Sequence, residues 1–113
     1  MAIINATIGT STAAAYTSSG NNAITTVIVC NTATFNPSNP TSGLTYLYLY
    51  AVPSGGDAAS PATNTLIVNG LPVPAGETVS LDQEKMVLSS GDMLVAKSGS
   101  PANLVVTVST LPV

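Results

Sequence analysis

The chain has 113 residues, of which only 6% are charged, and its formal net charge is −3. Ordinary soluble domains are roughly 25% charged, because charge keeps the surface of a free monomer wet and self-repelling. With two lysines and neither arginine nor histidine, the composition excludes a basic surface for nucleic acid or for anionic membrane, and it excludes an imidazole base. We therefore expect a non-enzymatic protein without a cofactor or metal, whose surface lies against other protein.

The length allows one domain, and the hydrophobic content of 45% is too high for a disordered chain. Segments rich in Val, Ile, Thr and Tyr alternate with clusters of Gly, Pro, Ser and Asn, which is typical of an all-β protein. We predict a single antiparallel β-sandwich of about eight strands, jelly-roll or immunoglobulin-like. Its expected strands are Ile3–Ile8, Ala13–Thr17, Ile24–Asn31, Leu44–Val52, Thr65–Val68, Glu77–Leu81, Asp92–Lys97 and Leu104–Ser109.

The N-terminal segment is apolar and carries no charged side chain. We expect residues 1–12 to form an extended arm or an edge strand, with the sandwich itself spanning residues 13–113. An uncharged strand of this kind is suited to lie across a neighbouring molecule or to add a strand to its sheet. Candidate contact residues in this segment are Ile3, Ile4 and Ile8.

The third predicted strand is apolar on both faces between Val27 and Cys30. This pattern is expected of a central strand that is covered on both sides, by the opposite sheet and by a neighbouring subunit. Cys30 is interpreted as a buried small hydrophobic residue, because a reactive thiol would need a positive charge nearby.

The fourth predicted strand places Tyr46, Tyr48 and Tyr50 on one face and Leu47 and Leu49 on the other. If the leucines are core, the tyrosines form an outward ladder, and tyrosine is favoured at protein interfaces. Two alternatives remain open at this stage: the rings cap one sheet with their hydroxyls in water, or they form a platform for a sugar.

Three shorter patterns complete the middle of the chain. Asn69-Gly70 predicts a two-residue hairpin turn, after which Pro72 and Pro74 restrict the second arm to a sheet edge. Leu81–Leu88 is the one helix candidate, and a single turn between strands is expected there. The carboxylates at positions 82 and 84, beside a lysine, lack the spacing and the glycine of a calcium loop, so a solvated acidic turn is expected.

Alternation assigns the faces of the last two predicted strands. In the eighth strand, Leu104, Val106 and Val108 are expected to point into the core. In the seventh, Leu94 and Ala96 are expected inward, and Val95 with its odd-numbered neighbours outward.

Several stretches together resemble a known family. They are Tyr16 with the polar turn after it, Thr25–Thr32, Val52–Gly56, Pro74–Thr78 and Ser90–Asp92. These stretches run over most of the chain and are similar to small structural proteins of tailed-phage virions. They are turn and core signatures and include no active site. The chain departs from the family pattern in its long Asn36–Gly43 loop and in its uncharged N-terminal extension.

The resemblance implies a β-sandwich virion component, most like the capsid decoration (cement) proteins, which are often trimeric on the outer shell. It implies synthesis in the host cytoplasm and two partners, the major capsid protein and further copies of this chain. The expectation is a decoration protein that stabilises the phage head. The alternatives are a tail, neck or baseplate component, or a receptor- or glycan-binding module of a fibre. For the glycan reading, Asn36–Gly43 and Pro53–Pro61 are the loops we would expect to form a pocket.

Overall fold

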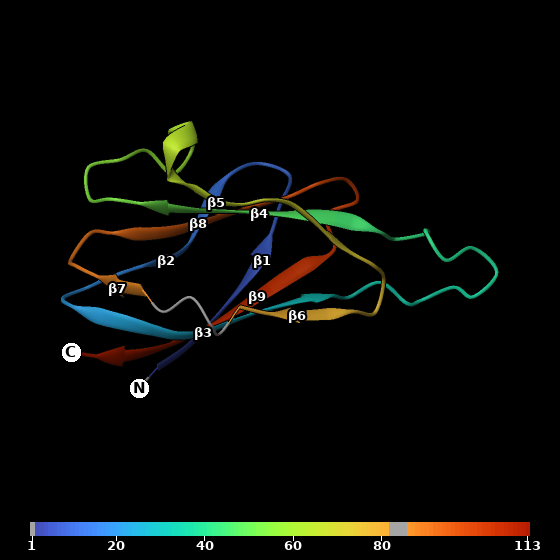
Figure 1. Cartoon of the computed structure of the whole chain (residues 1–113), viewed down its shortest axis with the longest axis horizontal. Helices are drawn as coiled ribbons and strands as arrows, with labels where there is room; N and C mark the ends of the chain where they lie inside the picture. The colour runs from blue at the N-terminus through green and yellow to red at the C-terminus, as the bar shows by residue number, and fades with distance from the viewer. Residues whose placement is uncertain (1, 82–85) are drawn as a thin grey trace.

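Strands dominate the computed structural model, which describes residues 2–81 and 86–113 (Figure 1). The prediction of an all-β sandwich is confirmed, with nine strands in the described residues rather than eight. A short 3₁₀ turn, η1 (Thr63–Thr65), precedes β5. The strands are β1 (Ala2–Ile8), β2 (Ala13–Thr17), β3 (Asn22–Asn31), β4 (Thr45–Val52), β5 (Leu66–Val73), β6 (Thr78–Ser80), β7 (Met86–Leu88), β8 (Met93–Ser98) and β9 (Leu104–Pro112).

The strands pair in nested order around the centre of the chain. β4 pairs with β5, β3 with both β6 and β7, β2 with β8, and β1 with β9, always antiparallel. The chain is thus one long hairpin rolled into two sheets. The larger sheet has the order β1-β9-β3-β6, and β7 pairs with the same edge of β3 as β6 but at the other end of that strand. The smaller sheet has the order β2-β8-β4-β5. This arrangement is a jelly roll.

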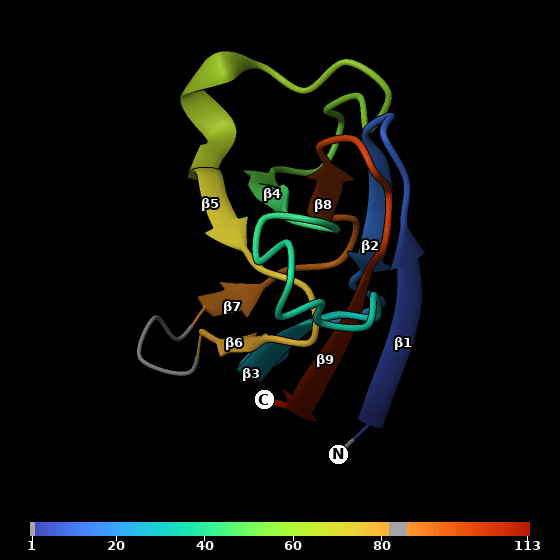
Figure 2. The ribbon, with the colours of Figure 1, turned by 90° about the vertical axis from the view of Figure 1, so that its right-hand side faces the viewer.

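The core lies between the two sheets, seen edge-on in Figure 2. Alternation predicts its contents well, because Leu104, Val106 and Val108 are buried, as are Leu94 and Ala96. Val95 is an exception to simple alternation: it points away from this core yet has no exposed surface. The loop that follows β4 reaches past β8 to the start of β2, because β8 lies between β4 and β2 in the smaller sheet. There the hydroxyl of Thr12 donates a hydrogen bond of 2.9 Å to the carbonyl of Ala59.

The predicted hairpin at Asn69-Gly70 is wrong. Both residues lie inside the continuous strand β5, where Leu71 pairs with Leu47 and Asn69 with Tyr48, so Gly70 is an extra residue opposite no partner. Its φ of +73° is the left-handed conformation that glycine adopts without strain, and a bulge needs this conformation as much as a tight turn does. The sheet-edge prediction for this arm is confirmed, since β5 is an edge strand.

The helix candidate Leu81–Leu88 is wrong at its described end, and the single turn expected between strands falls largely on residues outside the described ranges. Met86–Leu88 form β7 and pair with Asn22–Ile24 of β3. Met86 and Leu88 point inward and Val87 points outward, which is the alternation of a strand. The carboxylates predicted to form an acidic turn, at 82 and 84, lie outside the described residues.

The long 32–44 loop and the end of β5 are held by Asn31, a buried residue at the end of β3. Its amide nitrogen donates to the carbonyls of Gly43 and Val73 at 2.8 and 2.9 Å, and its side-chain oxygen accepts from the Ala33 N–H at 2.9 Å. A buried amide with all these partners satisfied ties the long 32–44 loop to the end of the sandwich. Within residues 2–81 and 86–113, no helix has the length and apolar character needed to cross a membrane.

Candidate functional site

The described part of the chain contains few side chains of the kinds that catalyse reactions or bind metal ions. No group of three or more His, Cys, Asp or Glu side chains lies close enough there to hold a metal ion. Cys30, expected in the core, instead points to the outer side of the larger sheet and is partly exposed. The reason is that Val27 and Val29 take the inward positions of β3, so Cys30 alternates to the outer side, which no described element covers.

The tyrosine ladder has the geometry that the sequence predicts. Leu47 and Leu49 are buried in the core, and the three tyrosines point away from it. Tyr46 is the most exposed, at 41%, whereas Tyr48 and Tyr50 are half-buried. The Nζ atom of Lys97 lies 4.8 Å from the centre of the Tyr48 ring, so this face carries a positive charge.

The predicted contact residues of the N-terminal strand do not share one face. Ile3 is 69% exposed and points outward from the larger sheet. Ile4 packs partly against the core, and Ile8 is 3% exposed and belongs to it. Because side chains of a strand alternate, only Ile3 offers its side chain to a partner on the outer face. This face lies on the opposite side of the sandwich from the tyrosines.

The outward side chains of the larger sheet form a surface that we call the outer face. It consists of cross-strand rows. Two rows run from β1 through β9 to β3, namely Ile3–Ser109–Thr26 and Asn5–Thr107–Ile28. A third row runs from β9 through β3 to β7, namely Leu111–Ala23–Val87. None of the described residues on this face is charged. Its large exposed apolar side chains are Ile3, Ile28, Val87 and Leu111.

The described charges lie elsewhere. Asp57 and Asp92 are in loops, Glu77 is in the turn before β6, and Lys97 is on the smaller sheet. Among the described residues, the outer face is therefore uncharged across all five strands of the larger sheet, β1, β9, β3, β6 and β7. Free monomers rarely expose a surface of this kind, and its usual place is against other protein.

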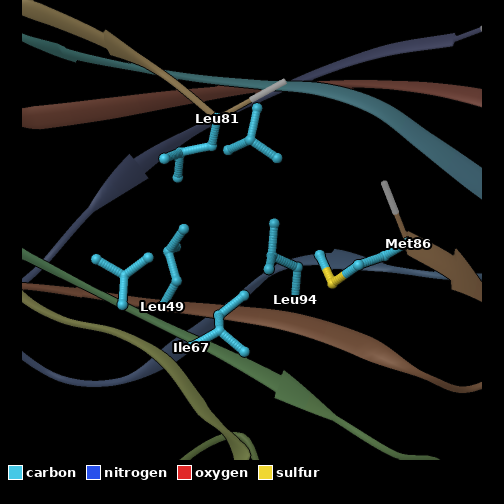
Figure 3. A pocket seen from close by; sticks show the side chains of 7 residues that line it. Leu49, Ile67, Leu81, Met86 and Leu94 are labelled. Atoms are coloured by element: carbon cyan, nitrogen blue, oxygen red, sulfur yellow. The ribbon is translucent and has the colours of Figure 1, made fainter. Parts of the chain in front are cut away.

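An apolar cleft of about 470 Å³ opens between the two sheets (Figure 3). Leu49, Ile67 and Leu94 of the smaller sheet face Leu81 and Met86 across it. None of its described lining residues has a polar side chain. A site that orients a polar substrate combines apolar walls with a few placed polar groups, and the described lining supplies the apolar walls alone. The described residues that line it are Val27, Leu49, Ile67, Val68, Leu81, Met86 and Leu94.

The two loops nominated for glycan binding lie at opposite ends of the sandwich (Figure 1). Asn36–Gly43 precedes β4 and Pro53–Pro61 follows it, so the whole length of that strand separates them. They form no shared pocket.

Three apolar residues of the outer face escaped the sequence analysis. Leu111 continues the outward phase of β9 beyond the predicted end of that strand, and alternation carried two residues further would have found it. Val87 was not assigned to a sheet face, because Leu81–Leu88 was considered as a helix or turn rather than as a strand. Ile28 was expected to be covered, and at 38% exposure it is the central apolar residue of an open face.

Comparison of the chain with protein-family models, with curated proteins and with solved structures finds no match.

Proposed function

We propose that this protein is a structural subunit of a phage virion, a capsid decoration protein that binds the outer shell and stabilises the head. The observation that carries the proposal is the outer face of the larger sheet, on which no described residue is charged and which has Ile28 near its centre. A surface without charge and with several exposed aliphatic side chains loses little polar hydration when protein covers it.

Two further observations support this role. The resemblance to tailed-phage virion proteins rests on turn and core stretches over most of the chain. The jelly-roll topology is widespread in viral capsid proteins, although lectins and cupins share it. The wide separation of the two nominated loops weighs against the lectin-like alternative.

The stabilising mechanism follows from mass action. A subunit that binds the assembled shell and not the free capsid protein lowers the free energy of the assembled state. Each contact is repeated by the symmetry of the shell, so a modest contribution per copy becomes large over the whole particle. The outer face supplies the shell contact in this proposal, and the tyrosine ladder on the opposite side supplies contact with further subunits.

Co-sedimentation with empty heads that lack this protein tests the proposal. The expected result is saturable binding at a fixed ratio to the major capsid protein, and heads that withstand higher temperature once saturated. Purified tails serve as the matched control particle. Binding to tails and not to heads would move the protein to the tail or neck, and binding to neither particle would overturn the virion proposal.

The tyrosine ladder needs a test of its own. Alanine at Tyr46, Tyr48 and Tyr50 together is expected to weaken binding between subunits while the fold persists, because the buried leucines of β4 are unchanged. Oligomers and head binding that survive this triple substitution would remove the ladder from the proposal.

A further inference from the structure

The edges of the two sheets differ in how well they are protected against pairing with another chain. Exposed edge strands are usually blunted by bulges, proline, charge or short length. β2 and β5 are interrupted by bulges, and β5 also contains Pro72. β6 and β7 have three residues each. Only β1, among the edge strands described, has none of these features.

β1 is seven residues long and pairs with β9 in unbroken register from Ala2 to Ile8. It contains no charge, no proline and no glycine. Alternate backbone N–H and C=O groups of an edge strand point away from its one neighbour. Among the described residues, those of β1 have no hydrogen-bonded backbone partner outside β9, and nothing lies beyond the strand in Figure 2.

The approach to this edge is also unobstructed. β2, the edge of the smaller sheet on the same side, exposes the short side chains of Ala13 and Ala14. A hollow of about 20 Å³ lies between the two strands and is lined by Ala6 and Ile8 among others. Ala13 and Ala14 therefore present only short side chains to a second strand that lies alongside this part of β1.

We propose that β1 pairs antiparallel with β1 of a second copy of this chain, about a two-fold axis at Asn5. In this register Ala2 lies opposite Ile8, Ile3 opposite Thr7, and Ile4 opposite Ala6. Residues that face the core then meet residues that face the core, as a continuous sheet requires. The two five-stranded sheets become one sheet across the axis.

The sequence of β1 is complementary to itself in this register. Each isoleucine meets a smaller residue, so the side chains interlock without crowding. Asn5 meets Asn5, where its Oδ1 accepts from the Thr107 hydroxyl at 2.8 Å and keeps a second lone pair that can accept from the amide nitrogen of the facing Asn5. A strand without charge has no like-charge repulsion when it pairs with its own copy. These features favour a second copy over an unrelated strand as the occupant.

Pairing across β1 enlarges the outer face. A two-fold axis perpendicular to the sheet keeps both outer faces on the same side of the joined sheet, so the pair presents twice the uncharged surface of one chain. The inference concerns contact between copies and holds independently of the virion proposal.

Charge placed at positions 3 and 7 tests the register directly. Ile3→Lys with Thr7→Lys puts like charges opposite each other twice across the axis, whereas Ile3→Lys with Thr7→Glu puts opposite charges there. Both positions are exposed in the single chain and about 13 Å apart along the strand, so the two new charges interact little within one chain, and the variants differ in the sign of the charge at position 7.

Sedimentation velocity from low micromolar to near-millimolar concentration gives the dissociation constant of each protein. We expect a reversible dimer for the unmodified chain, a constant raised by about tenfold or more in the Lys/Lys variant, and a constant within about threefold of the original in the Lys/Glu variant. A chain that stays monomeric throughout overturns the proposal. So does an oligomer, trimer included, that responds equally to both variants.

A cross-link provides a second readout that needs no added charge. In a Cys30→Ala background, Asn5→Cys places two thiols opposite each other across the axis, with Cβ atoms about 5 Å apart. Oxidation is expected to give a covalent dimer quickly, while Thr63→Cys in the same background, exposed in η1 and far from the edge, does not. Equal cross-linking of the two variants would contradict the β1 contact.

Discussion

Lys97 and Tyr48 face each other across β8 and β4, and the lysine Nζ lies 4.8 Å from the centre of the tyrosine ring. A cation over an aromatic ring at this distance is attracted by the negative face of the ring. The contact fixes the middle rung of the tyrosine ladder. It also places a positive charge on the smaller sheet, so the two outer sides of the sandwich differ in character.

Replacing Lys97 with Met tests this contact, because methionine keeps the apolar stem and removes the charge. We expect the free energy of unfolding to fall by about 0.5–1 kcal/mol, measured by urea denaturation. Lys97→Arg is the matched control and is expected to keep most of the stability. A methionine variant as stable as the original would show that the charge contributes nothing there.

The two faces of β4 predict opposite responses to truncation at adjacent positions. Leu47 has no exposed surface, so Leu47→Ala leaves a cavity and is expected to cost about 2–5 kcal/mol. Tyr46, its neighbour on the outer side, is 41% exposed, and Tyr46→Ala is expected to cost less than about 1 kcal/mol. Similar losses in the two variants, by the same denaturation assay, would contradict the assigned faces.

Asn31 is expected to be the polar residue whose change costs most. Asn31→Asp keeps its size but replaces two N–H donors with an oxygen, facing the carbonyls of Gly43 and Val73. A buried carboxylate oxygen held against two carbonyl oxygens should lower the free energy of unfolding by roughly 2–4 kcal/mol, although the Gly43 carbonyl keeps a second donor, the Asn103 amide nitrogen at 3.2 Å. Asn39→Asp, in the exposed part of the same loop, is the control and should change stability little. Equal effects at the two positions would remove the anchoring role from Asn31.

Much of the fold could be predicted because the strands alternate cleanly. Leu104, Val106 and Val108 mark a buried face without ambiguity, and so do the leucines of β4. The errors arose where one local pattern fits two structures. Asn69-Gly70 suits a tight turn and a bulge equally, since both need a residue with positive φ, and the choice depends on pairing with β4, which is distant in sequence.

The interaction surface was predictable only in part for a similar reason. The sequence indicates that β1 is uncharged, but alternation relative to β9 decides that Ile3 points outward and Ile8 into the core. The outer face combines residues from strands far apart in the chain, such as Ile28, Val87 and Leu111. No short stretch of sequence contains it, because the nested pairing of the jelly roll assembles it.

The most direct test of the central claim is head binding by a variant with a charge at the centre of the uncharged outer face. Ile28→Lys introduces that charge at a position already 38% exposed, where the lysine stem can lie along the sheet with its ammonium group in water. Thr63→Lys adds the same charge in η1, away from the face. We predict that Ile28→Lys weakens co-sedimentation with empty heads by about tenfold or more, the loss expected when an unpaired charge is buried, and that Thr63→Lys binds as the original does. Equal binding by both folded variants would contradict the claim that this face is covered by the shell.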